Sequence, residues 1–169
     1  MILKNKAFYW ALLAYITCFS SCKIYSLTGA NVEGKTINIA FIENNARNIV
    51  PNLSAVFTDK LRQRILSQTS LAQLNSQNVD YEMSGQITQY EISVASITGT
   101  ETSARNRLTI AVEIEFISKL NTKNNFTQTF TRFADFPSSQ NIQTVENQLI
   151  ASISEQLADD IFNKAFVNW

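Results

Sequence analysis

The sequence of 169 residues contains no histidine, and its two cysteines, Cys18 and Cys22, both lie near the N-terminus. Zinc sites and Ser–His–Asp or Cys–His catalytic groups are built from those two residue types. Glycine is scarce as well, with 4 residues, and none forms the glycine-rich loop that cradles a phosphate. These absences argue against the common hydrolytic mechanisms, against a zinc site and against a standard nucleotide-binding loop.

Charged residues are also few, at 17% of the chain, against about 25% in a typical soluble domain. Lys4 and Lys6 lie in an N-terminal segment that we expect to be removed. The remaining 12 basic residues then face 14 acidic ones, which gives a net charge near −2. A slightly acidic domain lacks the basic surface that nucleic-acid binding requires, so we expect no nucleic-acid partner.

The N-terminus has the three parts of a secretory signal: Lys4 and Lys6, an uncharged apolar run at 7–15, and small residues before Cys22. The apolar run is too short for a membrane span, which needs about 20 residues. The small residues before Cys22 resemble the bacterial lipobox, in which lipid is attached to the cysteine thiol and cleavage leaves that cysteine first. Phe19 departs from the aliphatic residue usual at its position. The alternative is an ordinary signal cut nearby, which would leave the cysteine free.

The lipobox reading divides the chain into a signal peptide at 1–21, a lipidated tether at 22–34 and a single domain at 35–169. Two or more acyl chains hold a protein firmly at a membrane, whereas one holds it only marginally. The residue directly after the cysteine is Lys23 and not Asp, and no run of acidic residues comes after it. By resemblance to sorted lipoproteins, this favours the outer membrane, facing the periplasm.

The rest of the chain alternates between two apolar periods, as expected for strands and helices. Apolar residues recur every three or four positions over 53–66 and 142–165, which predicts two amphipathic helices, each with one buried stripe. Elsewhere apolar and polar residues alternate, which predicts half-buried strands. The predicted elements are strands at 35–42, 79–97, 108–116 and 126–136, helices at 53–66 and 142–165, and a short edge strand at 71–74.

This order, strand–helix–strand–strand–strand–helix, predicts an α+β fold of two layers, with both helices on one face of a four-stranded mixed β-sheet. The other face of the sheet is left for water or for a partner. In the first strand, Ile37, Ile39 and Phe41 are expected to share the buried face. In the long strand the apolar positions change from odd to even numbers, which predicts a β-bulge near Thr88–Gln89.

Acidic pairs give little sign of catalysis. Glu113 and Glu115 are two residues apart on an alternating strand, which is typical of a solvated sheet face. Asp159 and Asp160 lie late in the second helix without the spacing of a calcium loop, so we expect them to be solvent-exposed. We therefore predict that the protein is not an enzyme and that it holds no metal.

Three arginines form the more informative group. If the last three strands run up and down, Arg105 and Arg107 lie near each other at one edge of the domain, with Arg132 within reach. Converging guanidinium groups bind phosphate bidentately. The competing interpretation pairs Arg132 with Glu113 or Glu115 across the hairpin and leaves the other two arginines solvated.

Several segments together resemble the LptE family of outer-membrane lipopolysaccharide-assembly lipoproteins, in its Bacteroidetes-type form. The likeness spans nearly the whole chain after the signal, and it depends on the order and spacing of motifs that are individually weak. Besides the lipobox, these are Tyr25–Ala30, Arg107–Ile110, Phe133–Phe136, Ser138–Asn141 and Ile161–Ala165.

The resemblance implies two helices on a four-stranded sheet and a plug inside the LptD β-barrel that helps the barrel to assemble and to deliver lipopolysaccharide to the outer leaflet. It also implies that Arg105, Arg107 and Arg132 contact lipopolysaccharide phosphates. No cofactor is implied beyond the covalent lipid on Cys22. The alternative is a periplasm-facing lipid-binding lipoprotein without a fixed barrel partner.

Overall fold

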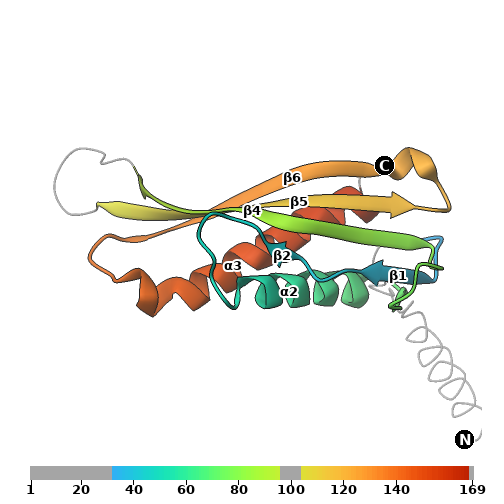
Figure 1. The fold of residues 1–169 in the computed structure, drawn as a ribbon, viewed down its shortest axis with the longest axis horizontal. Helices are drawn as coiled ribbons and strands as arrows, with labels where there is room; N and C mark the ends of the chain where they lie inside the picture. Colours follow the sequence, from blue (N-terminus) through green and yellow to red (C-terminus); the bar gives the residue numbers. More distant parts are fainter. Residues whose placement is uncertain (1–31, 96–103, 168–169) are drawn as a thin grey trace, which may run out of the picture.

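The computed structural model describes residues 32–95 and 104–167. Two helices lie side by side beneath one face of a twisted sheet (Figure 1). The strands are β1 Thr36–Ile39, β2 Glu43–Asn44, β3 Ala72–Gln73, β4 Tyr81–Ala95, β5 Arg105–Ser118 and β6 Phe126–Pro137. The helices are α2 Leu53–Gln68 and α3 Ile142–Phe162, with a 3₁₀ turn η2 at Thr122–Asn124 and a π-helical turn η3 at Asn163–Val167.

The sheet is mixed, as predicted, but the described residues form six strands in it instead of four. Its order is β3-β1-β4-β5-β6, with β2 paired to β4 beyond the end of β1. The strands β1, β2 and β3 run parallel to their neighbours, whereas β4, β5 and β6 form an antiparallel meander. The short edge strand expected at 71–74 is β3. Strand β2 was missed because two residues are too few to show a period.

The predicted bulge in β4 is confirmed. The register against β5 shifts between Ile87 and Gln89, so that Thr88 is the extra residue. Ile87 and Tyr90 can therefore both face the helices, and both are buried. Without the extra residue, every later side chain of β4 would point to the opposite face.

The helices cover the sheet with the predicted apolar stripes. Leu53, Phe57, Leu61 and Ile65 of α2 are buried, and so are the positions of α3 from Ile150 to Phe162 that point to the sheet. These side chains form one core with the helix-facing residues of β4, β5 and β6. Neither helix is long and apolar enough to cross a membrane.

The expectation for Phe41 is wrong. Strand β1 ends at Ile39, and the chain turns before β2, so that Phe41 is 54% exposed and Ile42 takes the buried position. The backbone N–H of Ile42 donates to the buried hydroxyl of Thr58 on α2, 3.1 Å away. This bond fixes the turn against the helix layer, because a buried backbone N–H must find a partner.

The opposite face of the sheet carries no helix in the described part of the chain (Figure 1). Along β6 this open face presents Thr127, Thr129 and Thr131, all exposed, and along β5 it presents Glu113 and Glu115. The open face is thus largely polar, in contrast to the apolar helix-facing side.

Candidate functional site

The open face carries an arginine–carboxylate–aromatic cluster where β5 begins and β6 ends. Arg107 donates two hydrogen bonds to Asp135, from Nε to Oδ1 at 2.7 Å and from Nη2 to Oδ2 at 3.0 Å. The two residues are directly paired across β5 and β6. The Arg107 guanidinium carbon also lies 3.7 Å from the centroid of the Phe133 ring, which is 49% exposed. Such stacking on an aromatic face is favourable for a guanidinium group.

The pairing changes the protonation equilibria of both partners. Hydrogen bonds from Arg107 hold the pKa of the Asp135 carboxyl below its ordinary value, and the bond to Asp135 raises the pKa of Arg107. Both groups therefore stay charged at neutral pH. The bidentate fork of Arg107 is already occupied, so an incoming phosphate must share it or displace the carboxylate.

Arg105 lies beside this pair and is exposed. Its Nη2 donates to the backbone carbonyl of Asp135 over 3.4 Å, and no carboxylate of the described residues forms an ion pair with it. Of the three predicted arginines, it is therefore the one with the most available hydrogen-bond donors. Arg105 and Arg107 do lie close together, as the sequence predicted.

Arg132 does not join them. It is paired in register with Ile110, whose side chain points into the core, so it lies on the helix side of the sheet. There its Nε and Nη2 donate to Asp160 of α3, at 2.5 and 2.6 Å. The expected convergence of three guanidinium groups is wrong, and so is the alternative pairing of Arg132 with Glu113 or Glu115.

Asp159 and Asp160 are not simply solvated either. Asp159 lies 2.9 Å from Nε of Arg64 on α2, and Asp160 is bound by Arg132. The two acids thus tie α3 to both of its neighbours, α2 and β6. The sequence could not show this, because the partners lie 28 residues or more away along the chain.

Glu113 and Glu115 line a shallow hollow on the open face, at the other end of the sheet from Arg107. Glu113 accepts from Nε2 of Gln86 at 3.3 Å, and Glu115 accepts from the hydroxyl of Ser84 at 3.4 Å. The hollow is lined by neutral or acidic residues, with no cation among them. This fits the predicted solvated sheet face.

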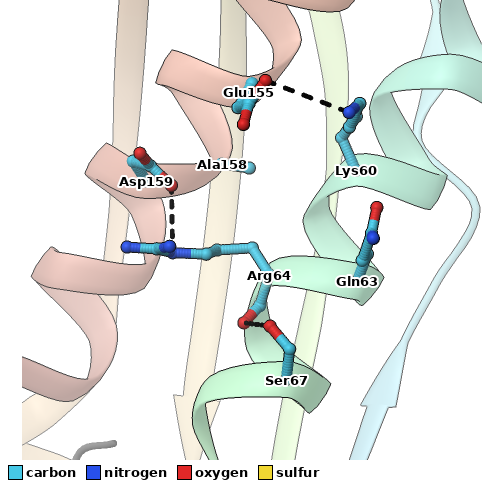
Figure 2. A pocket seen from close by; sticks show the side chains of 7 residues that line it. All are labelled: Lys60, Gln63, Arg64, Ser67, Glu155, Ala158 and Asp159. Carbon is cyan, nitrogen blue, oxygen red and sulfur yellow. Dashed lines mark hydrogen bonds and ion pairs between the residues drawn. The ribbon is translucent and has the colours of Figure 1, made fainter.

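A second hollow lies between α2 and α3 on the outer surface of the helix layer (Figure 2). Lys60 of α2 faces Glu155 of α3 at 3.9 Å, and Arg64 faces Asp159. The buried Ala158 lies between these two ion pairs along α3. Partly exposed pairs of this kind stabilise by about 0.2–1 kcal/mol each. Their charges balance, so the hollow has no preference for an ion of either sign.

Some predicted features lie outside the described residues. These are Cys22, the signal peptide, the tether up to Asn31, the motif at 25–30 and the last two residues of the strand expected at 79–97. Among residues 32–95 and 104–167, no group of three acidic, histidine or cysteine side chains could hold a metal ion.

Comparison of the sequence with models of known protein families assigns the chain to a family. The model of the LptE family, described as lipopolysaccharide-assembly, matches residues 34–165. The chain belongs to the LptE family. Members of the LptE family are non-enzymatic and have no known cofactor, and membership gives this chain a role in lipopolysaccharide assembly. No curated protein matches the sequence significantly.

Solved structures are similar to this chain at low sequence identity. The hypothetical protein CT253 from Chlamydia trachomatis is 10% identical, with a TM-score of 0.53 over 79% of this chain and 98% of that one. A minor lipoprotein from Acinetobacter baumannii is 12% identical, with a TM-score of 0.47 over 79% and 93%. Rare lipoprotein B from Shewanella oneidensis is 14% identical, with a TM-score of 0.47 over 76% and 92%. The first of these supports the two-layer fold.

Proposed function

We propose that this LptE-family protein is a non-catalytic outer-membrane lipoprotein that acts as plug and assembly partner of an LptD-type β-barrel, in the transport of lipopolysaccharide to the outer leaflet. Lipid on Cys22 would hold it at the periplasmic side of the membrane. The family match over residues 34–165 is the observation that carries this proposal.

The surface chemistry supports a place inside a water-filled barrel. Exposed threonines on β6 and the acidic residues of β5 make the open face polar without giving it a strong charge of one sign. The interior of a large outer-membrane barrel is itself polar. A plug with such a surface can be hydrated and hydrogen-bonded in the lumen without burying uncompensated charge.

Phosphate contact at the arginine end is part of the proposal, with the geometry now restricted to Arg105 and Arg107 on the open face. Arg105 has guanidinium donors without a partner among the described residues, and the guanidinium group of Arg107 lies beside it over the ring of Phe133. Lipid A phosphates could bind Arg105 directly and share Arg107 with Asp135. Arg132 would make at most a separate contact from the helix side, since Asp160 already occupies its fork.

The alternative, a lipid-binding lipoprotein without a fixed barrel partner, would need an apolar pocket for acyl chains. Most of the large hydrophobic side chains of this fold instead pack into one core between sheet and helices. The hollows on the open face and between the helices are lined mainly by polar and charged residues. These features favour the plug over the carrier.

Depletion of the protein in its own cells separates the two functions. The plug predicts loss of correctly assembled barrel and of newly made lipopolysaccharide at the cell surface, and the chain lacking Arg105 and Arg107 should still restore barrel assembly. A free carrier predicts an unchanged amount of assembled barrel. That result would contradict the proposal.

A further inference from the structure

The outer edge of β4 is paired with other strands along its first half but not along its second half. From Tyr81 to Ile87 it is covered by β1 and then by β2. Beyond Ile87, β5 is the only strand of the described residues that pairs with β4. Figure 1 shows this far part of β4 extending past the N-terminal end of α2. The segment from Gln89 to Ala95 is therefore an edge strand, although β4 lies inside the sheet over its first half.

The hydrogen bonds of β4 show which backbone groups point out of this edge. The carbonyl of Ile87 accepts from the backbone N–H of Asn45 on the outer side, at 2.9 Å. After the bulge at Thr88, the carbonyl of Tyr90 accepts on that same side from the side-chain amide of Asn48, at 3.3 Å. Since the backbone groups of successive residues point to alternate sides of a strand, Tyr90 fixes the direction for the residues after it.

It follows that Ile92 and Val94 direct both their N–H and their C=O groups outward, whereas Ser93 directs its groups toward β5. No described residue accepts or donates at the outward groups of Ile92 and Val94. Two residues with both groups available offer four hydrogen bonds in the spacing of a β-ladder. Exposed edges with this arrangement are templates for another strand.

The side chains at the edge specify the kind of strand. Ile92 is 42% exposed and Val94 is 70% exposed, and both lie on the helix side of the sheet, where Tyr90 is buried. Ile49, next to Asn48 in the preceding loop, is 76% exposed. On the other face the same segment carries the polar residues Glu91 and Ser93, both exposed. A matching strand has apolar side chains at every second position and polar ones between them.

We propose that the edge of β4 at Glu91–Ala95, which we name the β4 edge, receives an extended segment of the barrel partner by strand addition. Its alternate apolar side chains would cover Ile92 and Val94. This inference rests on the proposed function for the identity of the partner. The strands of a closed barrel already pair their backbone groups with one another, but its longer loops lie outside that pairing and can present an extended segment for strand addition.

A photo-reactive amino acid placed at Val94 tests the contact in native membranes. Irradiation should link position 94 to one defined extended segment of the barrel, identified by mass spectrometry, whereas Asp59 on the outer surface of α2, the exposed control, should reach other parts of the barrel but not that segment. A link from position 94 to a second copy of this chain, or no link while the intact protein still copurifies with the barrel, overturns the inference and leaves the proposed function standing. Absence of any barrel from the purified material instead contradicts the proposed function.

A pair of substitutions separates the backbone contact from the side chain. Val94→Thr and Val94→Pro both replace the valine side chain with one of similar size, but only proline removes the outward N–H. We expect the proline variant to give about fivefold less complex than the threonine variant, since one hydrogen bond is lost. Ser93→Pro removes an N–H that bonds to β5, so this variant should fold less stably. That result would confirm that the backbone groups of Ser93 point toward β5 and those of Val94 point outward. Equal recovery for the two Val94 variants, with Ser93→Pro unfolding as expected, contradicts strand addition.

Discussion

Tyr90 of β4 donates a hydrogen bond from its hydroxyl to Oε1 of Glu146 on α3, at 2.6 Å. The contact exists because the bulge at Thr88 turns Tyr90 to the helix side of the sheet. Burial, together with the bond to Glu146, raises the pKa of the Tyr90 hydroxyl above its ordinary value. The pair joins the start of α3 to the sheet.

Replacement of Tyr90 by Phe should therefore lower the free energy of unfolding by about 1.5–3 kcal/mol, the usual worth of a hydrogen bond to a charged group. Urea unfolding of the chain without residues 1–21 and with Cys22→Ala measures this. The matched control is Tyr90→Phe in a Glu146→Gln background, where the loss should be smaller. An equal loss in both backgrounds would show that packing, and not the hydrogen bond, is responsible.

Gly85 is the position in β4 that cannot carry a side chain. A Cβ there would lie 2.1 Å from the backbone carbonyl oxygen of Glu113 on β5. Because backbone atoms of a paired strand cannot move aside, Gly85→Ala should destabilise by about 3 kcal/mol or more. Ser84→Ala, one residue earlier on the open face, is the control and should have a small effect. A fully stable Gly85→Ala protein would mean that β4 and β5 are farther apart than described.

Acid stability should depend on Asp80. Hydrogen bonds from the backbone N–H of Lys35, at 2.8 Å, and from the N–H and hydroxyl of Thr36 hold the pKa of this carboxyl below its ordinary value. A pKa that is lower in the folded than in the unfolded state stabilises the fold above the unfolded value, about 3.9, and this contribution is lost as the pH falls toward the folded value. Asp80→Asn should therefore flatten the fall in melting temperature between neutral pH and about pH 3. An unchanged slope would assign the acid sensitivity to other carboxylates.

Lipid A binding should respond differently to the two arginine sites. The double substitution Arg105→Ala and Arg107→Ala should weaken binding of lipid A with phosphates and lower the free energy of unfolding by no more than about 1 kcal/mol, because the pair of Arg107 with Asp135 is partly exposed. Asp135→Asn should strengthen binding, since it releases the fork of Arg107. Lipid A without phosphates is the control ligand in a titration followed by calorimetry. Equal binding by the wild type and the double variant would show that Arg105 and Arg107 do not bind the phosphates of lipid A.

Arg132 should behave as a structural residue. Arg132→Ala leaves Asp160 without its partner and should lower stability by up to about 1 kcal/mol, because the pair is partly exposed. The double variant with Asp160→Ala should be no less stable than Arg132→Ala alone. Thermal melts of the wild type and of the two variants test this. A loss of lipid A binding in Arg132→Ala without a loss of stability would show that Arg132 belongs to the binding site.

The sequence predicted those parts of the fold that depend on apolar period. The change of parity at Thr88 predicted the bulge, and the three-and-four spacing predicted both helices. Strand β2, with two residues, has no period to detect, and Phe41 was misplaced because β1 ends two residues before it. The turn that exposes Phe41 is fixed by a contact with Thr58, which lies far along the chain.

The candidate site was predictable only in part. Arg132 has the same parity as Phe130 and Phe136, which are buried, whereas Arg107 has the parity opposite to that of the buried Leu108. This signal could have placed the two arginines on opposite faces. The choice of Asp160 as the partner of Arg132 depends on where α3 crosses β6, and local sequence does not determine such a crossing.

The central proposal is that this LptE-family chain works as the lipid-anchored companion of an outer-membrane barrel. Its most direct test is purification of the protein from detergent-solubilised membranes of its own cells, with mass spectrometry of the partner and of Cys22. We expect an LptD-type barrel to copurify in an amount equal to that of this protein, and acyl chains to be attached to Cys22. Recovery of the protein alone, water-soluble and with an unmodified cysteine, would contradict the central proposal.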